Sequence, residues 1–269
     1  MRYVNNFYLV LILSSVFAIL IGCQSKSEKN SMDNKSTIVF LISEDPNNYD
    51  AHVTIPEFAR QLEENFRFNT QVLLGDGPQH AYEFPDLSVL ADADLLVVFC
   101  RRLALSDKQM QQIKDYISSG KPVMGIRTAN HAFSVRDAEI PKGYTDWWDF
   151  VPEVLGSNNK GYGPVDPGTD IYVESTSANH PILQGIDETF WHSTGNVYIV
   201  DNTLDEKATV LLRGRVEEAG LDEPVAWVWE NVYGGKMFYS SVGHPEDFKN
   251  KDNIKIFNQA IAWLIQQTY

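Results

Sequence analysis

The feature that most constrains the fold is an alternation of short apolar runs with helical stretches, which starts at residue 37. Thr37–Ser43 (TIVFLIS) and Leu95–Cys100 (LLVVFC) are almost entirely apolar, which is typical of strands buried on both faces. Between them, Ile55–Phe66 spaces its apolar side chains along one face of a helix. Strands that alternate with helices in this way predict an α/β fold with a parallel sheet.

The rest of the chain continues this pattern and then departs from it. A helix is expected to begin at Ser106, where Gln109 stands at the capping-box spacing and Gly120 at the position of a terminating glycine. After about Pro141 the chain turns to aromatics, glycines and short strands, which predicts an irregular insertion in one domain. The other expected elements are strands at 70–74, 122–126, 224–229 and 236–242 and a last helix at 253–266.

The N-terminal segment reads as a targeting signal. Arg2 precedes an apolar run at 7–20, which is too short for a comfortable membrane span. It ends in Leu20-Ile21-Gly22-Cys23, which resembles a bacterial lipobox; a plain secretory signal with a chance cysteine is the alternative. We therefore expect a signal peptide at 1–22, lipidation at Cys23, a polar tether at 23–36 and the folded domain at 37–269. The expected location is the bacterial cell envelope, with the protein anchored to a membrane.

Charge and cysteine content exclude several classes of protein. The chain has 22 basic and 36 acidic residues, a net charge of −14, and no basic cluster. Binding to a nucleic-acid backbone is therefore excluded. Two cysteines cannot form a disulfide framework, so the fold depends on its hydrophobic core.

Polar side chains follow several of the predicted strands, where parallel sheets bind their ligands. Because the carboxyl ends of parallel strands meet at one edge, four separate segments should deliver polar groups to the same place. These segments are Glu44 to His52, Cys100-Arg101-Arg102, Arg127 to His131, and His244 to Asp247.

Several segments together resemble the ThuA-like (trehalose utilisation) family. They occur in the family's order and cover about residues 37 to 265: Val98–Arg102, Gly120–Phe133 (GKPVMGIRTANHAF), Glu153–Gly156, His180–Ile182, Pro224–Trp227 and Gly243-His244. The resemblance implies a flavodoxin-like, class I glutamine amidotransferase-like three-layer sandwich with a mainly parallel sheet. It also implies a role in the use of trehalose and related disaccharides, including 3-keto sugars. In one departure, Gly161-Tyr162-Gly163 stands where family members often carry a histidine.

The amidotransferase comparison bears on one activity. Those enzymes carry a nucleophilic cysteine on a strained turn between a strand and a helix, paired with a His-Pro-Glu segment. Here His244-Pro245-Glu246 keeps two of these residue types, but Arg127 stands at the nucleophile's position. Arginine cannot form an acyl-enzyme. We therefore expect no glutaminase activity.

The candidate site combines these positions. The expected catalytic residues are His244, Glu246 and His131, and the expected substrate-binding residues are Arg127, Asn130, Arg101, Glu44 and Trp147. Arg127, Asn130, His131, His244 and Glu246 are expected to share one pocket. Structural alternatives remain open for three of them. Arg127 could form a salt bridge, His131 could form a local hydrogen bond, and Glu246 could be exposed to solvent. The pair Trp147-Trp148 fits either a sugar-stacking platform or the core.

No cofactor is firmly implied. His52, His131 and His244 are candidate ligands of a divalent metal, although no close HxH or HExxH spacing supports one. Cys100 is interpreted as a buried thiol, and His80, His180 and His192 as structural.

Two functions remain open at this point. One is an enzyme of the hydrolase, isomerase or lyase type that acts on a small carbohydrate by acid/base chemistry. The other is a non-catalytic, lipid-anchored sugar-binding domain. A protein-interaction module would instead present an exposed apolar patch.

Overall fold

The computed structural model describes residues 35–66 and 68–266. The expected signal peptide and Cys23 lie outside these residues. No helix in the described part is long and apolar enough to cross a bilayer.

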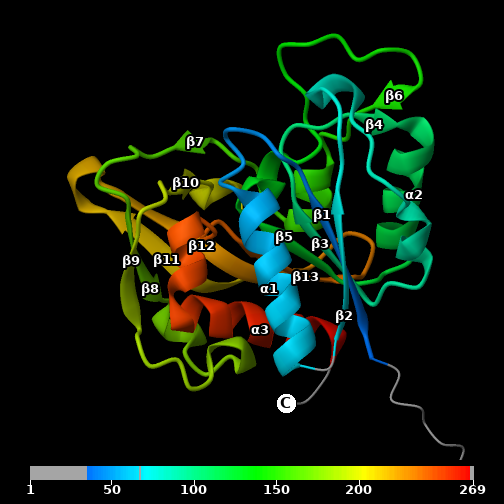
Figure 1. Cartoon of the computed structure of the whole chain (residues 1–269). Helices are drawn as coiled ribbons and strands as arrows, with labels where there is room; N and C mark the ends of the chain where they lie inside the picture. The colour runs from blue at the N-terminus through cyan, green and yellow to red at the C-terminus, as the bar shows by residue number, and fades with distance from the viewer. Residues whose placement is uncertain (1–34, 67, 267–269) are drawn as a thin grey trace, which may run out of the picture. The chain divides into compact units, whose positions relative to one another are not determined.

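One half of the central sheet is parallel. Its five neighbouring strands are β2 (Asn69–Leu74), β1 (Thr37–Ile42), β3 (Leu95–Phe99), β5 (Val123–Ile126) and β13 (Lys236–Ser240). Four of them come from the first half of the chain, and β13 joins them from near its end (Figure 1). The α/β fold expected from the alternation is confirmed.

The other half of the same sheet is antiparallel. From β13 outward it contains β12 (Leu221–Glu230), β11 (Thr209–Val216), β8 (Thr169–Val173) and β9 (Phe190–Ser193). The segment after residue 141 therefore extends the central sheet and does not form a separate layer. Two further ribbons join β4 (Leu105–Ser106) to β6 (Tyr144–Thr145) and β7 (Gly161–Tyr162) to β10 (Tyr198–Ile199).

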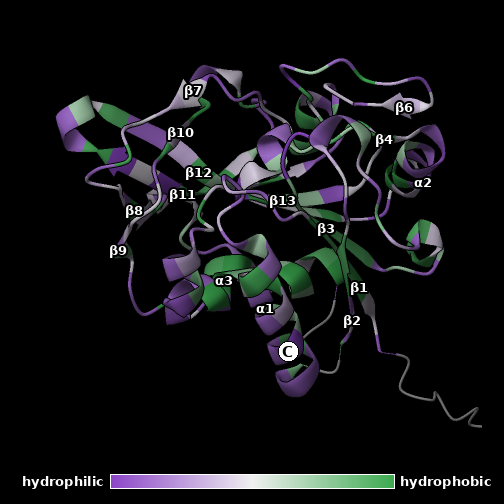
Figure 2. Cartoon of the chain, turned by 45° about the horizontal axis from the view of Figure 1, so that its top comes forward, coloured by the Kyte–Doolittle hydropathy of each residue, from purple (hydrophilic) through white to green (hydrophobic). Residues whose placement is uncertain are grey.

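Helices cover both faces of the sheet. The helices α1 (Ala51–Asn65) and α3 (Lys251–Ile265) pack on one face, and α2 (Asp107–Ser118) with the π-helical turn Val151–Leu155 packs on the other. Successive strand residues point to opposite faces, so Phe40 joins the first core and Val39 the second. Figure 2 shows the central strands largely hydrophobic, as burial on both faces requires.

Two local expectations need correction. The helix expected from Ile55 begins one turn earlier, because the N–H groups of Val53 and Thr54 donate to the Asp50 carbonyl at 2.8 and 3.0 Å. The capping box at Ser106 is not formed. Gln109 instead hydrogen-bonds the N–H and carbonyl of Phe84, at 3.0 and 2.7 Å. A tertiary contact thus takes the side chain that the local pattern assigned to the cap.

Candidate functional site

The carboxyl ends of the parallel strands are joined by Asn48. Its Nδ2 donates to the carbonyls of Ser43 and Phe99, at 2.7 and 3.0 Å, and its Oδ1 accepts from the hydroxyl of Thr128. The residues that follow β1, β3 and β5 therefore adjoin, as the sheet topology predicted. Nothing in the sequence marked Asn48, because a single asparagine in a loop has no distinctive pattern.

The strained turn expected at Arg127 is present. Arg127 follows β5 directly and adopts the left-handed backbone conformation, with φ at 44°. Such a conformation is uncommon outside glycine and persists only where the surroundings enforce it. Here the Tyr239 hydroxyl, from the adjacent strand, donates to the Arg127 carbonyl at 2.7 Å.

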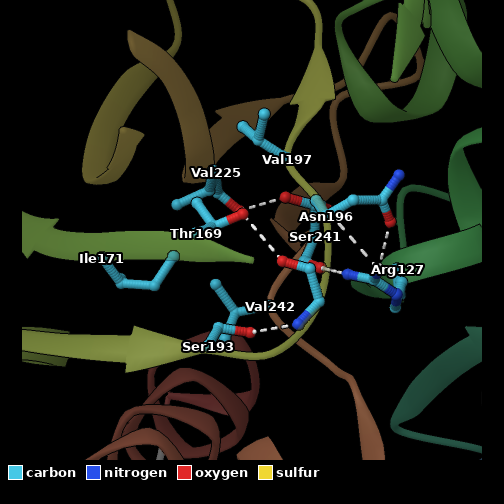
Figure 3. Close-up of a pocket in the computed structure, with 10 residues that line it drawn as sticks. Arg127, Thr169, Ile171, Ser193, Asn196, Val197, Val225, Ser241 and Val242 are labelled. Atoms are coloured by element: carbon cyan, nitrogen blue, oxygen red, sulfur yellow. Dashed lines mark hydrogen bonds between the residues drawn. The ribbon is translucent and has the colours of Figure 1, made fainter. Parts of the chain in front are cut away.

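The Arg127 side chain is held inside the protein. It is 1% exposed, and its guanidinium lies 3.8 Å from the ring centre of Tyr49. Nη1 donates to the Ser241 carbonyl at 2.6 Å, and Nη2 to Oδ1 of Asn196 at 2.9 Å (Figure 3). Gly195 permits this approach, since a Cβ there would lie 2.9 Å from Nη1.

The cavity beside Arg127 is small. Its volume is about 10 Å³, room for about one water molecule. In this position Arg127 joins the ends of β5 and β13 to the loop after β9. Its expected role in binding substrate oxygens stays a prediction.

His244 lies near Arg127 but not in the arrangement expected from the sequence. Its Nδ1 accepts from the Thr194 hydroxyl at 2.8 Å and from the Glu246 N–H at 3.4 Å. The Glu246 carboxylate turns away and pairs with Lys249 at 2.6 Å. The Glu246 carboxylate therefore does not orient the imidazole.

Asp247 is the carboxylate that shapes this loop. It accepts from the His244 backbone N–H at 2.8 Å, and this bond completes a capping box. It also accepts from the Ser193 hydroxyl at 3.0 Å. Burial raises the pKa of Asp247. Burial and the nearby Arg127 charge lower the pKa of His244, which favours its neutral form.

A second cavity, called here the His131 cavity, has a volume of about 70 Å³. Its lining combines aromatic rings with side-chain amides and a guanidinium: Asn130, His131, Ser134, Arg136, Trp148, Val151, Asn158, Asn159 and Tyr162. The rings of Trp148 and Tyr162 are 50% and 45% exposed. Trp147, the expected platform, is only 7% exposed and belongs to the core, so Trp148 replaces it as the ring available to a ligand.

His131 is a buried, neutral imidazole. Its Nδ1 contacts Oδ1 of Asn130, an acceptor, which selects the tautomer with the proton on Nδ1 and leaves Nε2 able to accept one. Burial, followed by the charges of Arg102, Arg101, Arg136 and Arg127, lowers its pKa well below the ordinary value. Asn130 Nδ2 is buried and has no hydrogen-bond partner among the described residues.

The five side chains expected in one pocket are therefore divided. Asn130 and His131 line the His131 cavity, Arg127 lines the small cavity beside β13, and neither includes His244 or Glu246. Residues that the sequence did not single out complete the surroundings, namely Tyr49, Asn158, Asn159, Thr194, Asn196 and Tyr198. Trp148 and Tyr162 had been noted only indirectly, through the Trp147-Trp148 pair and the Gly161-Tyr162-Gly163 segment.

The remaining candidates lie elsewhere at the same edge. Glu44 is exposed and lies 3.9 Å from His52, while Arg101 lies 3.5 Å from Asp45. Within residues 35–66 and 68–266, no three His, Cys, Asp or Glu side chains are grouped so as to hold a metal ion. Cys100 is fully buried, as predicted, and burial raises the pKa of its thiol.

The buried His131 predicts a pH-dependent stability. Its pKa is lower in the folded protein than the ordinary 6.5, so the unfolded chain takes up a proton first as the pH falls. Stability should decrease below about pH 6.5, by at most about 1.4 kcal/mol per pH unit from this group. Urea unfolding at pH 7 and pH 5 should show a smaller loss in His131→Gln than in the wild type. Equal losses in both proteins would contradict the assignment.

Comparison with known proteins bears on the fold and the family of the chain. A search of curated proteins finds no match. The solved structure of a ThuA-like protein from Bacteroides uniformis is similar, with a TM-score of 0.61 and 15% identity over 85% of this chain and 91% of the other. A ThuA-like protein from Parabacteroides merdae also has a TM-score of 0.61, with 13% identity over 87% of this chain and 92% of the other. These likenesses establish the fold.

The sequence itself establishes the family. Residues 39–264, most of the chain, match the family model ThuA, described as trehalose utilisation. This match supports a carbohydrate-related role. The chain therefore belongs to the ThuA family.

Proposed function

We propose that the protein binds a carbohydrate in the His131 cavity. The observation that carries this proposal is the combination of two exposed aromatic rings, Trp148 and Tyr162, with side-chain amides in one cavity. A pyranose has an apolar C–H face that suits a flat aromatic ring, and hydroxyls around its edge that need hydrogen-bonding partners.

The amides supply those partners. Asn130 and Asn159 each carry a buried Nδ2 with no partner among the described residues. Unpaired buried donors are uncommon in folded proteins, and one that lines a cavity is available to a ligand oxygen. Asn158 and Ser134 add further polar groups to the same lining.

We further infer that His131 transfers a proton to or from the bound sugar. As a neutral imidazole with its proton on Nδ1, it offers the Nε2 lone pair as a base. Disaccharides and 3-keto sugars are the candidate substrates. Glutaminase activity is not expected, because Arg127 takes the nucleophile's position and the Cys100 thiol is fully buried.

The test is a screen of disaccharides and 3-keto sugars for binding and turnover, followed by His131→Gln. Glutamine keeps a polar side chain of similar reach but cannot serve as a base. We expect turnover to fall by about 100-fold or more, as is usual for loss of a general base, while affinity changes little. Unchanged turnover in His131→Gln would exclude this role.

A binding-only function is the second candidate. It is favoured by the absence of His244 and Glu246 from the described lining of the His131 cavity, which leaves His131 without the second proton carrier expected from the sequence. Saturable sugar binding without turnover of any screened sugar, with or without added divalent metal, would select this alternative.

We also propose that Cys23 anchors the protein to the bacterial cell envelope, on the basis of the sequence Leu20-Ile21-Gly22-Cys23 and the polar segment after it. Cys23→Ser should abolish acylation and move the protein out of the membrane fraction. Mass spectrometry of the N-terminal peptide and cell fractionation provide the measurement. An unmodified Cys23 in wild-type protein from the soluble fraction would contradict the proposal.

A further inference from the structure

Positive charge gathers around the His131 cavity, although the chain as a whole is acidic, with a net charge of −14. Four arginines, at positions 101, 102, 127 and 136, act electrostatically on His131. A local concentration of one sign of charge at a cavity attracts ligands of the opposite sign.

Arg102 lies behind the cavity wall. It is 8% exposed, its backbone is in the left-handed region with φ at 55°, and its N–H donates to the His131 carbonyl at 3.0 Å. Its Nη1 donates to the carbonyl of Ser134 at 3.3 Å, and Tyr162 is close enough to act electrostatically on it. Ser134 and Tyr162 both line the His131 cavity, so the guanidinium is adjacent to whatever occupies it.

Arg136 lies at the rim. Its guanidinium is 5.8 Å from the ring centre of Trp148, and both residues line the cavity. Burial, followed by the charge of Arg136, lowers the pKa of Arg102, so the two like charges lie near each other.

Within residues 35–66 and 68–266, neither guanidinium has a counter-ion. Among the described residues, no carboxylate lies within 4.0 Å of Arg102 or Arg136, whereas Arg101 lies 3.5 Å from Asp45. The described lining of the cavity contains no acidic side chain. Asp146 accepts from the indole N–H of Trp148 at 2.7 Å. A buried guanidinium without a carboxylate is unfavourable unless some other anion is supplied.

An unpaired hydrogen-bond donor on a side chain that lines the cavity also favours an anionic ligand. Asn130 is 3% exposed, lines the cavity, and has an Nδ2 with no partner among the described residues. Its Oδ1 is already engaged by His131, so the free group of this amide is the donor. The unpaired group of this lining side chain is therefore a hydrogen-bond donor.

We propose that the ligand of the His131 cavity is an anionic carbohydrate, a sugar that carries a carboxylate or a phosphate. The sugar ring lies against Trp148 and Tyr162, and the anionic group is held by Arg136 and the Asn130 amide. The charge of Arg102, behind the cavity wall, adds to the attraction. Guanidinium groups suit both anions, because their planar fork of donors matches carboxylate and phosphate oxygens. This inference rests on the proposed carbohydrate function and narrows its substrate class. A bound anion would also offset the charges that oppose protonation of His131, and so make it a better base.

The test is calorimetric titration of the folded protein with three probes: methyl glucoside, methyl glucuronide and glucose 6-phosphate. We expect at least one anionic sugar to bind about tenfold or more tightly than the neutral glucoside, since hydrogen bonds to charged groups are the stronger ones. The anionic sugar that binds more tightly identifies the group as carboxylate or phosphate. The preference should weaken as salt is added.

Matched variants test which residues cause the preference for an anionic sugar. Arg136→Gln should remove most of the anionic preference, whereas Lys251→Gln, which removes an exposed cation at the start of α3 on the other face of the sheet, should leave it unchanged. Arg102→Gln, checked for folding by its thermal transition, should act as Arg136→Gln does. Equal affinity for neutral and anionic sugars would overturn this inference but leave the proposed function standing. If none of the three sugars binds, the anionic inference fails and the carbohydrate proposal loses its support as well.

Discussion

Replacing Arg127 with alanine is expected to lower the free energy of unfolding by about 3 kcal/mol or more, the range for removal of a large buried side chain. The substitution leaves a cavity between Tyr49 and Tyr198 and removes the donors to the Ser241 carbonyl and to Asn196. Position in a loop at the end of a strand predicts the opposite, an intact fold, because such loops usually bury little. Urea unfolding of both proteins provides the measurement.

Two further variants separate the loss of packing from the loss of hydrogen-bond donors at position 127. Arg127→Met keeps a stem that packs on the two rings but has no donors, so its loss of stability should be intermediate. Arg136→Ala, at an exposed position, should change stability by no more than about 0.5 kcal/mol. A loss below 1 kcal/mol in Arg127→Ala would show that the surrounding network is not maintained by this side chain.

The adjacent tryptophans should respond in opposite ways. Trp147→Ala is expected to cost about 3–5 kcal/mol of stability, because its ring is buried and packs against Phe150 at a centroid distance of 5.4 Å. Trp148→Ala should leave stability within about 0.5 kcal/mol of the wild type. It should, however, weaken carbohydrate binding by about tenfold or more, since an exposed tryptophan in a binding site is typically among its strongest contacts.

Unfolding and calorimetric titration of the same two proteins check both halves of this prediction. The pair is a matched control, because the residues are neighbours in sequence and identical in type. Normal sugar affinity in Trp148→Ala would remove the ring from the site and with it the main support for the His131 cavity as a carbohydrate site.

The fold was largely predictable because its signal is local and repeated. Apolar runs such as Thr37–Ser43 can satisfy both their backbone and their side chains only as strands covered on both faces. The family resemblance, spread over most of the chain, then narrowed the α/β class to one architecture. The prediction was wrong at the N-cap of α2, where Gln109 was expected to complete a capping box with Ser106. Gln109 instead hydrogen-bonds the backbone of Phe84, 25 residues away.

The site was predictable only as far as backbone topology goes. Parallel strands bring their carboxyl ends to one edge, so the approach of the residues after β1, β3, β5 and β13 followed from their order in the chain. The directions of the side chains did not follow. Arg127 points into a network with Ser241 and Asn196, and Glu246 points to Lys249, because those partners come from turns whose geometry has no periodic signal.

The amino-acid sequence by itself determined the α/β class, the strand-end location of the polar groups, the strained turn at Arg127 and the family. Each depends on periodicity or on short motifs that act over a few residues. Only the tertiary structure decided that Trp148 and not Trp147 faces the cavity and that His131 is separated from His244. It also decided that Arg102 and Arg136 have no carboxylate partner in the part of the chain that the structure describes. These outcomes depend on packing and electrostatic contacts between segments far apart in the chain. The distances and orientations across such contacts follow from the folded structure, and no local sequence pattern encodes them.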